Sequence, residues 1–349
     1  MTHDAARKER RALRGSFSAI IHPRISFHAS RLSVPLAAAL VAAVAAGPCA
    51  WAQNYPAKPI RYIIAFPPGG SNDILARIIG ARMTELMGPT VLIDNRPGGG
   101  GNIGVEAIAR AAADGYTIGN ISATHTINAT LYPKLGYDIL KDFTPITRVA
   151  EIPILLAAHP VVPIRGPKEL IALTQKRRLT YGSSGIGTPG HLAAEMLRAY
   201  GARDLQHVPY KGGSPAAIDL ISGHIELLFN NMPELVPFVK AGKMRAIAVT
   251  SVKRDPVLPD TVSMIEAGFA GFDLGNWVAI VGPAGMPRDA VARLNAEIGK
   301  ILREPATRDK IAAQGFNIVT GTPDETGAYI RAEYEKWGKL VKLSGAKVE

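Results

Sequence analysis

The amino-acid sequence predicts an α/β protein with two lobes, each a mixed, mainly parallel sheet flanked by helices. Strand-like and helix-like segments alternate over most of the 349 residues, of which 47% are hydrophobic, and this alternation is typical of βαβ units. Two glycine-bearing turns, at 67–73 and 182–190, each follow a strand and precede a helix. Because these turns lie more than a hundred residues apart in a chain long enough for two domains, we expect one in each lobe.

The first predicted lobe starts with a strand at 61–66 and a helix at about 73–87, which ends at Gly88-Pro89. A strand at 91–94, a helix at about 103–112 and a strand at 117–121 continue the alternation. A strand at 151–158 then carries the chain out of this lobe. We therefore place the first lobe at 53–154, with a second contribution from 276–349 after the chain returns.

The second predicted lobe covers 155–275 and repeats the pattern. Its helices are expected at 167–176, 190–200 and 214–222, and its strands at 179–182, 205–208 and 225–229. The segment 277–281 is interpreted as the strand that returns to the first lobe, because helix signals dominate after it. One such signal is Thr322-Pro323-Asp324-Glu325, which has the pattern of a capping box. The two crossings, near 151–158 and 275–281, are the expected hinge.

Residues 1–52 have the pattern of a cleaved secretory signal peptide. Residues 1–31 carry seven Lys/Arg and two acids, and an apolar run follows at 34–46. This run is shorter than the ~18 residues that a membrane span needs, and Ala50-Trp51-Ala52 offers a cleavage site after Ala52. The pattern predicts export to the periplasm with no stable membrane anchor. Arg10-Arg11 leaves both the general and the twin-arginine route open, and a start codon assigned too early accounts for the long charged region equally well.

The composition excludes several classes of function. Cys49 is the only cysteine and lies in the predicted leader, which excludes disulfides, thiol catalysis and cysteine metal sites. Without the leader the chain has 33 basic and 27 acidic residues. It has no Lys/Arg-rich run with interleaved aromatics, so we expect no nucleic-acid binding. The histidines after the leader lack the spacing of zinc ligands, and we expect neither a metal nor a cofactor.

The two glycine-bearing turns are the best candidates for an anion-binding site. Gly69-Gly70 and the glycines of 185–190 can expose backbone N–H groups, and the helix after each turn adds a partial positive charge. In the second turn, Ser183, Ser184 and Thr188 carry hydroxyls that can donate to a carboxylate. Two half-sites of this kind, one in each lobe, suggest that the lobes close on one small acid.

Further polar residues stand at the ends of predicted strands, where open α/β sheets bind ligands. Asp73 lies in the first turn of its helix, where an acid complements the helix dipole, and we favour this capping role over ligand contact. The other candidates are Ser122 and His125 in the first lobe, and Tyr210, Lys211 and Asn230 in the second.

Two segments, at 99–104 and 185–190, spell the Gly-x-Gly-x-x-Gly pattern of dinucleotide-binding sites. Such a site also needs an acid about 20 residues later, at the end of the next strand, and neither segment has one. The serine-nucleophile pattern Gly-x-Ser-x-Gly fails as well, because Ile186 stands where its last glycine would be. No catalytic set emerges, and we expect no enzyme activity.

Several motifs occur in a characteristic order across essentially all of 55–349. They are Tyr55-Pro56-x-Lys58-Pro59-Ile60, Phe66-Pro67-Pro68-Gly69-Gly70-Ser71-Asn72-Asp73, Asp94-Asn95-Arg96-Pro97-Gly98, Gly101-Asn102-Ile103-Gly104, Asp114-Gly115-Tyr116-Thr117, Tyr181-Gly182-Ser183-Ser184-Gly185-x-Gly187-Thr188 and Pro209-Tyr210-Lys211-Gly212. Together they resemble the periplasmic solute-binding receptors of tripartite tricarboxylate transporters, the Bug or TctC family.

This resemblance implies a type II-like Venus flytrap, a two-lobed periplasmic binding protein that holds its ligand between the lobes. In the family, the loop after the first strand and the Ser/Gly/Thr loop of the second lobe act as pincers. The corresponding residues here are Pro68, Gly69, Gly70, Ser71, Asn72 and Asp73 in the first loop, and Ser183, Ser184, Gly187 and Thr188 in the second. The chain departs from the family at Pro67-Pro68, where many members have smaller residues, and at Asn230, where an acid is common.

The sequence therefore predicts an exported, monomeric receptor that captures a small carboxylate and delivers it to the membrane subunits of a transporter. The family's ligands include organic, amino and aromatic acids, so the resemblance does not choose one. Two alternatives stay open at this point. One is a periplasmic sensor that presents its ligand to a signalling partner, and the other is an NAD(P)-dependent oxidoreductase that uses one of the glycine-rich turns.

Cleavage after Ala52 should leave a mature chain that begins at Gln53. N-terminal sequencing of the protein from a periplasmic extract measures this directly. An intact leader recovered in the membrane fraction would contradict it.

Overall fold

The computed structural model describes residues 55–344 and 346; the predicted signal peptide at 1–52 and its cleavage site at Ala52 lie outside the described residues. The helices are α2 (Ser71–Met87), α3 (Asn102–Ala109), α4 (Ala123–Leu131), α5 (Pro167–Thr174), α6 (Pro189–Ala199), α7 (Gly213–Ile221), α8 (Met232–Lys240), α9 (Arg288–Arg303), α10 (Pro305–Ala312) and α11 (Pro323–Ser344), with a short 3₁₀ turn η1 (Gly99–Gly101). The strands are β1 (Ile60–Ile64), β2 (Val91–Asn95), β3 (Thr117–Ser122), β4 (Phe143–Ala158), β5 (Leu179–Ser183), β6 (Leu205–Pro209), β7 (Leu227–Asn231), β8 (Arg245–Val249), β9 (Gly275–Pro283) and β10 (Asn317–Ile318). Within this part of the chain, no helix is both long and apolar enough to cross a membrane.

The strands form one mixed sheet with two mainly parallel halves. Their order is β2-β1-β3-β9-β4-β7-β5-β6, and β8 and β10 pair with β4 outside this path. In the first half, β1 runs parallel to β2 and β3; in the second, β5 runs parallel to β6 and β7. β9 lies between the halves and pairs antiparallel with β3 and β4. The predicted α/β class and the predicted return strand are both confirmed.

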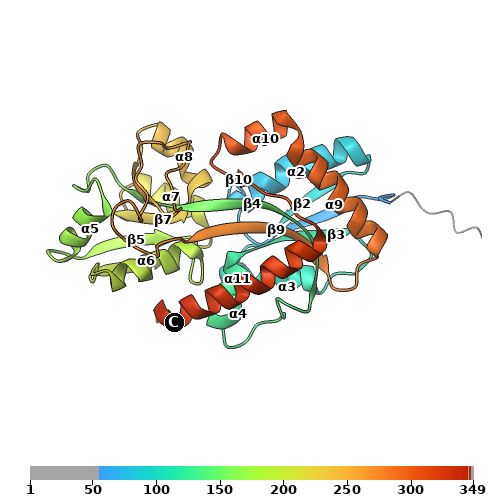
Figure 1. The fold of residues 1–349 in the computed structure, drawn as a ribbon, viewed down its shortest axis with the longest axis horizontal. Coiled ribbons are helices and arrows are strands. Elements are labelled where there is room, and N and C mark those ends of the chain that lie inside the picture. The colour runs from blue at the N-terminus through green and yellow to red at the C-terminus, as the bar shows by residue number, and fades with distance from the viewer. Residues whose placement is uncertain (1–54, 345, 347–349) are drawn as a thin grey trace, which may run out of the picture. The chain divides into compact units, whose positions relative to one another are not determined.

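The long strand β4 belongs to both halves of the sheet. Its residues 143–153 pair with β9, whereas residues 154–158 pair with β7. Figure 1 shows β4 and β9 side by side between one group of helices, α5 to α8, and another that contains α2, α9 and α10. The sequence predicted only 151–158 as strand, because Pro145 and polar residues interrupt the earlier part. The structure accommodates this part through shifts of register with β9 at 145–147 and 148–150.

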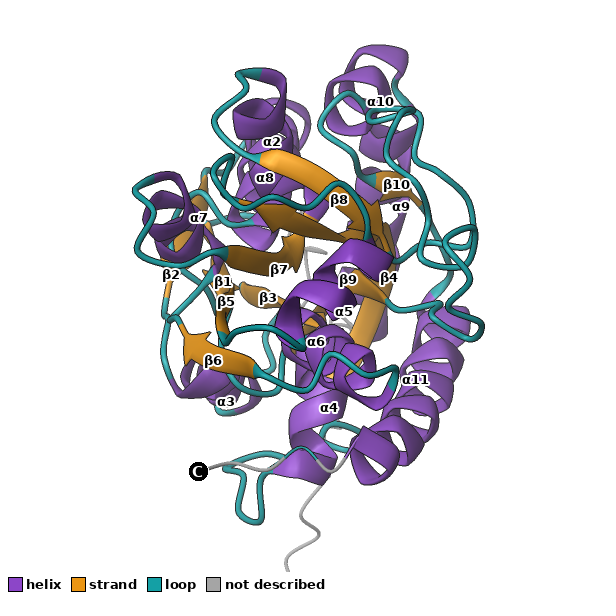
Figure 2. Ribbon diagram, turned by 90° about the vertical axis from the view of Figure 1, so that its left-hand side faces the viewer, coloured by secondary structure: helices purple, strands orange, loops and turns teal. Residues whose placement is uncertain are grey.

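Side chains that alternate along the strands fill separate apolar clusters on opposite faces. Tyr62 and Ile64 of β1 join the cluster under α2 and α9, whereas Ile63 between them joins the cluster under α3, α4 and α11. In β4, Leu155 packs toward α7 and α8, and Leu156 packs on the opposite face. Accordingly, Figures 1 and 2 show α2 and α8 on one side of the sheet, and α4 and α11 on the other.

The helices α4, α8 and α10 and the strands β8 and β10 were not predicted from the sequence. α8 contains Pro237 in its interior, and proline there removes a hydrogen bond and normally argues against a helix. α4 is rich in threonine and asparagine, which are weak helix formers. Tertiary contacts outweigh these local preferences, because the helices cover strands that would otherwise expose apolar side chains.

One buried carboxylate attaches the C-terminal helix α11 to the crossing strand β9. Glu333 of α11 accepts hydrogen bonds from the indole N–H groups of Trp277 in β9, at 2.9 Å, and of Trp337, at 2.7 Å. Both indoles are fully buried, and Lys336 lies 3.3 Å from the second carboxylate oxygen. The start of α11 is the predicted capping box, in which Thr322 and Glu325 each accept from the other's backbone N–H. α11 is therefore fixed both at its start and against β9.

Replacement of Glu333 by Leu should destabilise the protein strongly, because it leaves two buried indole donors without an acceptor. Each such donor costs about 1–3 kcal/mol, so the free energy of unfolding in urea should fall by roughly twice that amount. Glu333→Gln is the matched control, because its oxygen can still accept from both indoles. Equal stability of Glu333→Leu and Glu333→Gln would show that these hydrogen bonds contribute nothing.

Candidate functional site

The start of five helices surrounds a small cavity between the two halves of the sheet. These helices are α2, α4, α6, α7 and α8, and the strand β9 adds one residue to the wall. The volume of the cavity is about 20 Å³, enough for one water molecule. Its lining residues are Phe66, Pro67, Gly70, Ser71, Asn72, Thr124, Ser184, Thr188, Pro189, Gly190, Gly213, Ser214, Asn230, Asn231, Glu234 and Asn276.

The electrostatics of this cavity come mainly from the backbone. Each helix carries a partial positive charge at its N-terminus, and five such ends converge here. Among the described residues that line the cavity there is no Lys, Arg or His, and Glu234 is the one ionisable side chain. Such a site stabilises negative charge through N–H groups and neutral donors.

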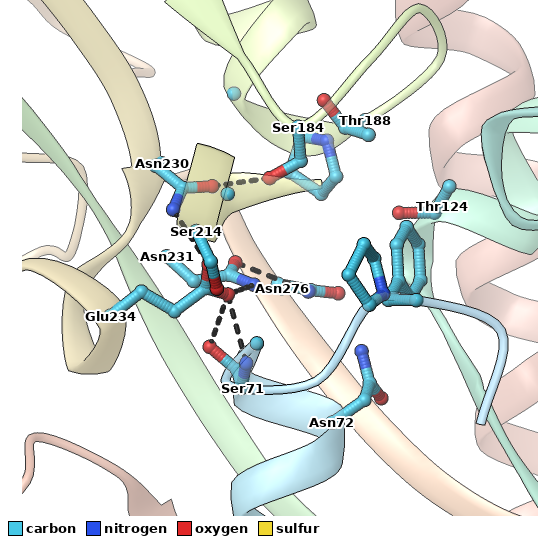
Figure 3. A pocket seen from close by; sticks show the side chains of 16 residues that line it. Ser71, Asn72, Thr124, Ser184, Thr188, Ser214, Asn230, Asn231, Glu234 and Asn276 are labelled. Atoms are coloured by element: carbon cyan, nitrogen blue, oxygen red, sulfur yellow. Dashed lines mark hydrogen bonds between the residues drawn. The ribbon is translucent and has the colours of Figure 1, made fainter. Parts of the chain in front are cut away.

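A chain of hydrogen bonds joins the two predicted pincers across the cavity (Figure 3). Ser71 at the start of α2 donates its backbone N–H and its hydroxyl to Glu234 Oε1, at 2.9 and 2.8 Å. Asn230 at the end of β7 donates to Glu234 Oε2 at 3.0 Å, and the Ser184 hydroxyl donates to Asn230 Oδ1. The predicted residues Ser71, Ser184 and Asn230 are thus brought together through Glu234.

Glu234 is the main residue of the cavity that the sequence did not predict. It is 8% exposed, and Asn231 donates to its Oε1 as well, at 3.2 Å. All its donors are uncharged, as a buried carboxylate without a cation requires. Its sequence signal was the Asn-x-x-Glu spacing from Asn231, which is typical of a helix start. Asn276 in the crossing strand β9 also lines the cavity and donates to Asn231 at 3.2 Å. No comparable sequence pattern indicated Asn276.

Six of the predicted ligand residues line the cavity, namely Gly70, Ser71, Asn72, Ser184, Thr188 and Asn230. Asp73 does not line it, and its carboxylate instead accepts from Gly69 N at 2.9 Å, Arg77 Nε at 2.8 Å and Asn95 Nδ2 at 2.9 Å. Burial acts to raise the pKa of Asp73, but these hydrogen bonds outweigh it and lower the pKa. Asp73 therefore stabilises the glycine-bearing turn and the start of α2 through hydrogen bonds. This arrangement agrees with the capping role that was favoured over ligand contact.

The first turn of α4 uses Ser122 and His125 for capping. The backbone N–H of Ser122 donates to His125 Nδ1 at 2.9 Å, and the two residues form a reciprocal capping box. Both side chains are fully buried, and burial lowers the pKa of His125 to about 3. Their neighbour Thr124, rather than either of them, lines the cavity.

The hydroxyls of the second turn are unequally available. Thr188 Oγ1 donates to the carbonyl of Gly185 at 2.8 Å and accepts from His191 N, so it caps α6. Ser183 Oγ lies 3.1 Å from the same carbonyl and 2.7 Å from His207 Nε2. The Ser184 hydroxyl is the one that contacts another element at the cavity.

The remaining predicted residues lie near the cavity but outside it. Pro68 and Gly69 are exposed in the first turn. Gly187 has φ +78°, and a Cβ there would lie 2.1 Å from Asn128 Oδ1, so glycine allows the second turn to contact α4. Tyr210 and Lys211 line a neighbouring groove together with Ser184 and 98–101, and the Tyr210 hydroxyl donates to Asp219 at 2.6 Å.

A two-lobed α/β fold with a polar cavity between its halves is the arrangement of periplasmic binding proteins. A protein-family model described as "Tripartite tricarboxylate transporter family receptor" matches residues 75–346. The chain therefore belongs to this family of solute receptors, as the resemblance indicated. Because the family consists of receptors and not of enzymes, the chain is not an oxidoreductase, and that alternative is excluded.

Individual relatives agree with this assignment. The Bordetella pertussis protein BugT is 33% identical over 302 residues, which cover 85% of this chain and 93% of BugT. A Rhodopseudomonas palustris protein solved with adipate has a TM-score of 0.82 and 34% identity, over 84% of this chain and all of that one. MatC from the same organism, solved with bound malate, has a TM-score of 0.78 and 28% identity, over 82% of this chain and all of MatC. The predicted two-lobed fold is thus confirmed.

His207 contacts Ser183 in the second glycine-bearing turn. Its ring stacks between Tyr181 and His191, with centroid distances of 4.7 and 4.5 Å. Burial, together with the nearby charges of His191 and Arg198, lowers the pKa of His207 to about 3. The imidazole that contacts Ser183 is therefore neutral in the folded protein at neutral pH.

Acidification should destabilise the protein through His207. An unfolded histidine binds a proton below pH of about 6.5, whereas folded His207 does so only near pH 3. Its contribution to the free energy of unfolding is full above the unfolded pKa and is lost as the pH falls toward 3. His207→Gln should therefore reduce the loss of stability between pH 7 and pH 5 by up to about 2 kcal/mol, measured by urea denaturation.

Ser183→Ala is the control for this measurement, because it breaks the contact with His207 but keeps the imidazole. It should retain the decline of the unmodified protein between the two pH values. An unchanged decline in His207→Gln would contradict the neutral, buried imidazole.

Proposed function

We propose that this protein is a periplasmic receptor that binds a small carboxylate between its lobes and delivers it to the membrane subunits of a tripartite tricarboxylate transporter. The observation that carries the proposal is the convergence of five helix N-termini on one cavity between the lobes. Oriented backbone dipoles of this kind favour an anion. Similarity to receptors solved with adipate and with malate supports the same ligand chemistry.

The groups that we propose for the ligand carboxylate lie at the starts of α6, α4 and α2. The Ser184 hydroxyl and the backbone N–H of Gly190 in α6 form one side, and Thr124 and Asn72 form the other. Asn72 is 4% exposed, and its side-chain oxygen has no hydrogen-bond partner among the described residues. Because this oxygen accepts hydrogen bonds and a carboxylate has no proton to donate, it favours a ligand that carries a hydroxyl or ammonium group in addition to its carboxylate.

Ligand entry requires the lobes to separate. A cavity of about 20 Å³ is too small for a dicarboxylate or an aromatic acid, and the Ser71–Glu234 hydrogen bonds close it. In the proposed mechanism, the lobes are 53–154 with 276–349, and 155–275, and they move about 151–158 and 275–281. A ligand can favour the closed form only by binding it more tightly than the open form.

We propose that the protein acts in the periplasm, as a monomer released from its signal peptide at 1–52. Membership of the receptor family of a transporter supports this location. A receptor that moves between its ligand and membrane subunits requires no anchor of its own. The membrane subunits then supply the transport step.

Ser184→Ala should weaken carboxylate binding, because it removes a hydroxyl donor from the proposed site. A hydrogen bond to a charged group contributes about 1.5–3 kcal/mol, which corresponds to an affinity loss of about 10- to 150-fold. A thermal-shift screen of organic, amino and aromatic acids first identifies a ligand, and calorimetry then measures its affinity for each variant.

Ser222→Ala, at an exposed serine after α7, is the control and should bind like the unmodified protein. Normal affinity of Ser184→Ala would remove Ser184 from the site. A screen in which no carboxylate raises the melting temperature would contradict the proposed function itself.

A further inference from the structure

Glu234 places a negative charge where the N-termini of several helices converge and favour an anion. Its Oε1 accepts the backbone N–H and the hydroxyl of Ser71, the first residue of α2. Its Oε2 lies against the start of α7, because a Cβ on Gly213 would lie 1.9 Å from it. Glu234 itself stands in the first turn of α8. The protein's own carboxylate thus occupies the N-terminal ends of α2, α7 and α8.

We propose that Glu234 is a specificity-determining residue that restricts the ligand to one carboxylate and selects a hydrogen-bond donor at the ligand's other end. The ligand class is then an amino or hydroxy monocarboxylic acid rather than a short dicarboxylate. This inference rests on the proposed carboxylate function and deepens it. One end of the cavity, at α4 and α6, then binds the ligand's carboxylate. The other end, at Glu234, accepts a hydrogen bond from the ligand.

The charges around Glu234 oppose a second carboxylate beside it. Its four donors come from Ser71, Asn230 and Asn231, and all are uncharged. Among the described residues that line the cavity, none carries a positive side chain. Two negative groups at this end would therefore repel one another with little solvent to screen them, since Glu234 is only 8% exposed.

The hydrogen bonds of Glu234 also leave a place for a donor. A carboxylate offers about four acceptor positions on its two oxygens. Three of the protein's donors go to Oε1, and one, from Asn230, goes to Oε2. Oε2 therefore retains one acceptor position, on a side chain that lines the cavity. An ammonium or hydroxyl group satisfies it, whereas a carboxylate has no proton to donate.

A matched series of ligands tests this inference by calorimetry. Malonate, succinate and glutarate are compared with the amino and hydroxy monocarboxylates of the same chain lengths, such as 4-aminobutyrate and 4-hydroxybutyrate for succinate. The unmodified protein should prefer the amino or hydroxy acid at its best chain length by at least tenfold. Glu234→Gln keeps an acceptor but removes the charge, and it should shift this ratio at least tenfold toward the dicarboxylate.

Two further variants make the result specific. Glu234→Asp keeps the charge but shortens the side chain that Ser71, Asn230 and Asn231 contact, so it should weaken binding of both ligands while the ratio still favours the amino or hydroxy acid. Glu335→Gln removes an exposed acid on α11 and should leave both affinities unchanged. Melting temperatures confirm that each variant is folded. Equal affinity for the matched pair, an unchanged ratio in Glu234→Gln, or binding to dicarboxylates alone would overturn the inference. None of these outcomes contradicts the proposed function. The proposed function is contradicted only if no carboxylate of any kind binds.

Discussion

The antiparallel pairing of β4 with β9 is the constraint on which the rest of the structure depends. β4 runs from the first half of the sheet into the second, parallel to β1, β2 and β3 but antiparallel to β7 and its parallel neighbours β5 and β6. The two sets of parallel strands therefore point toward each other. Because a helix follows the carboxyl end of each such strand, helix N-termini from both halves meet at one place.

The convergence of helix N-termini creates an electrostatic requirement at the cavity. Five partial positive charges, brought together in a buried space, favour a negative group. Glu234 supplies one, and hydrogen bonds from Ser71, Asn230 and Asn231 satisfy it without a cation. Glu234 also links elements far apart in the chain, since it joins α8 to α2. The same carboxylate thus contributes to closing the cavity and sets the charge of one of its walls.

Much of this arrangement could be predicted from local patterns. The turn at Gly69-Gly70, the capping box at Thr322 and Glu325, and the alternation of strands and helices are determined by neighbouring residues. The hydrogen bonds within these turns join residues only a few positions apart, so a sequence displays them directly. Local patterns failed where long-range packing decided the outcome: Pro237 did not prevent α8, and Pro145 did not end β4.

The sequence by itself determined the α/β class, the two glycine-bearing turns and the membership of a receptor family, because these depend on periodicity and on short motifs. Only the tertiary structure decided which polar groups face the cavity. Ser183, Ser184 and Thr188 are equivalent donors in the sequence, yet Ser183 contacts His207, Thr188 caps α6, and Ser184 faces Asn230. Glu234 gained its position beside Ser71, 163 residues away in the chain, because the crossing strands bring α2 and α8 together. Spacing along a chain carries no information about such a contact.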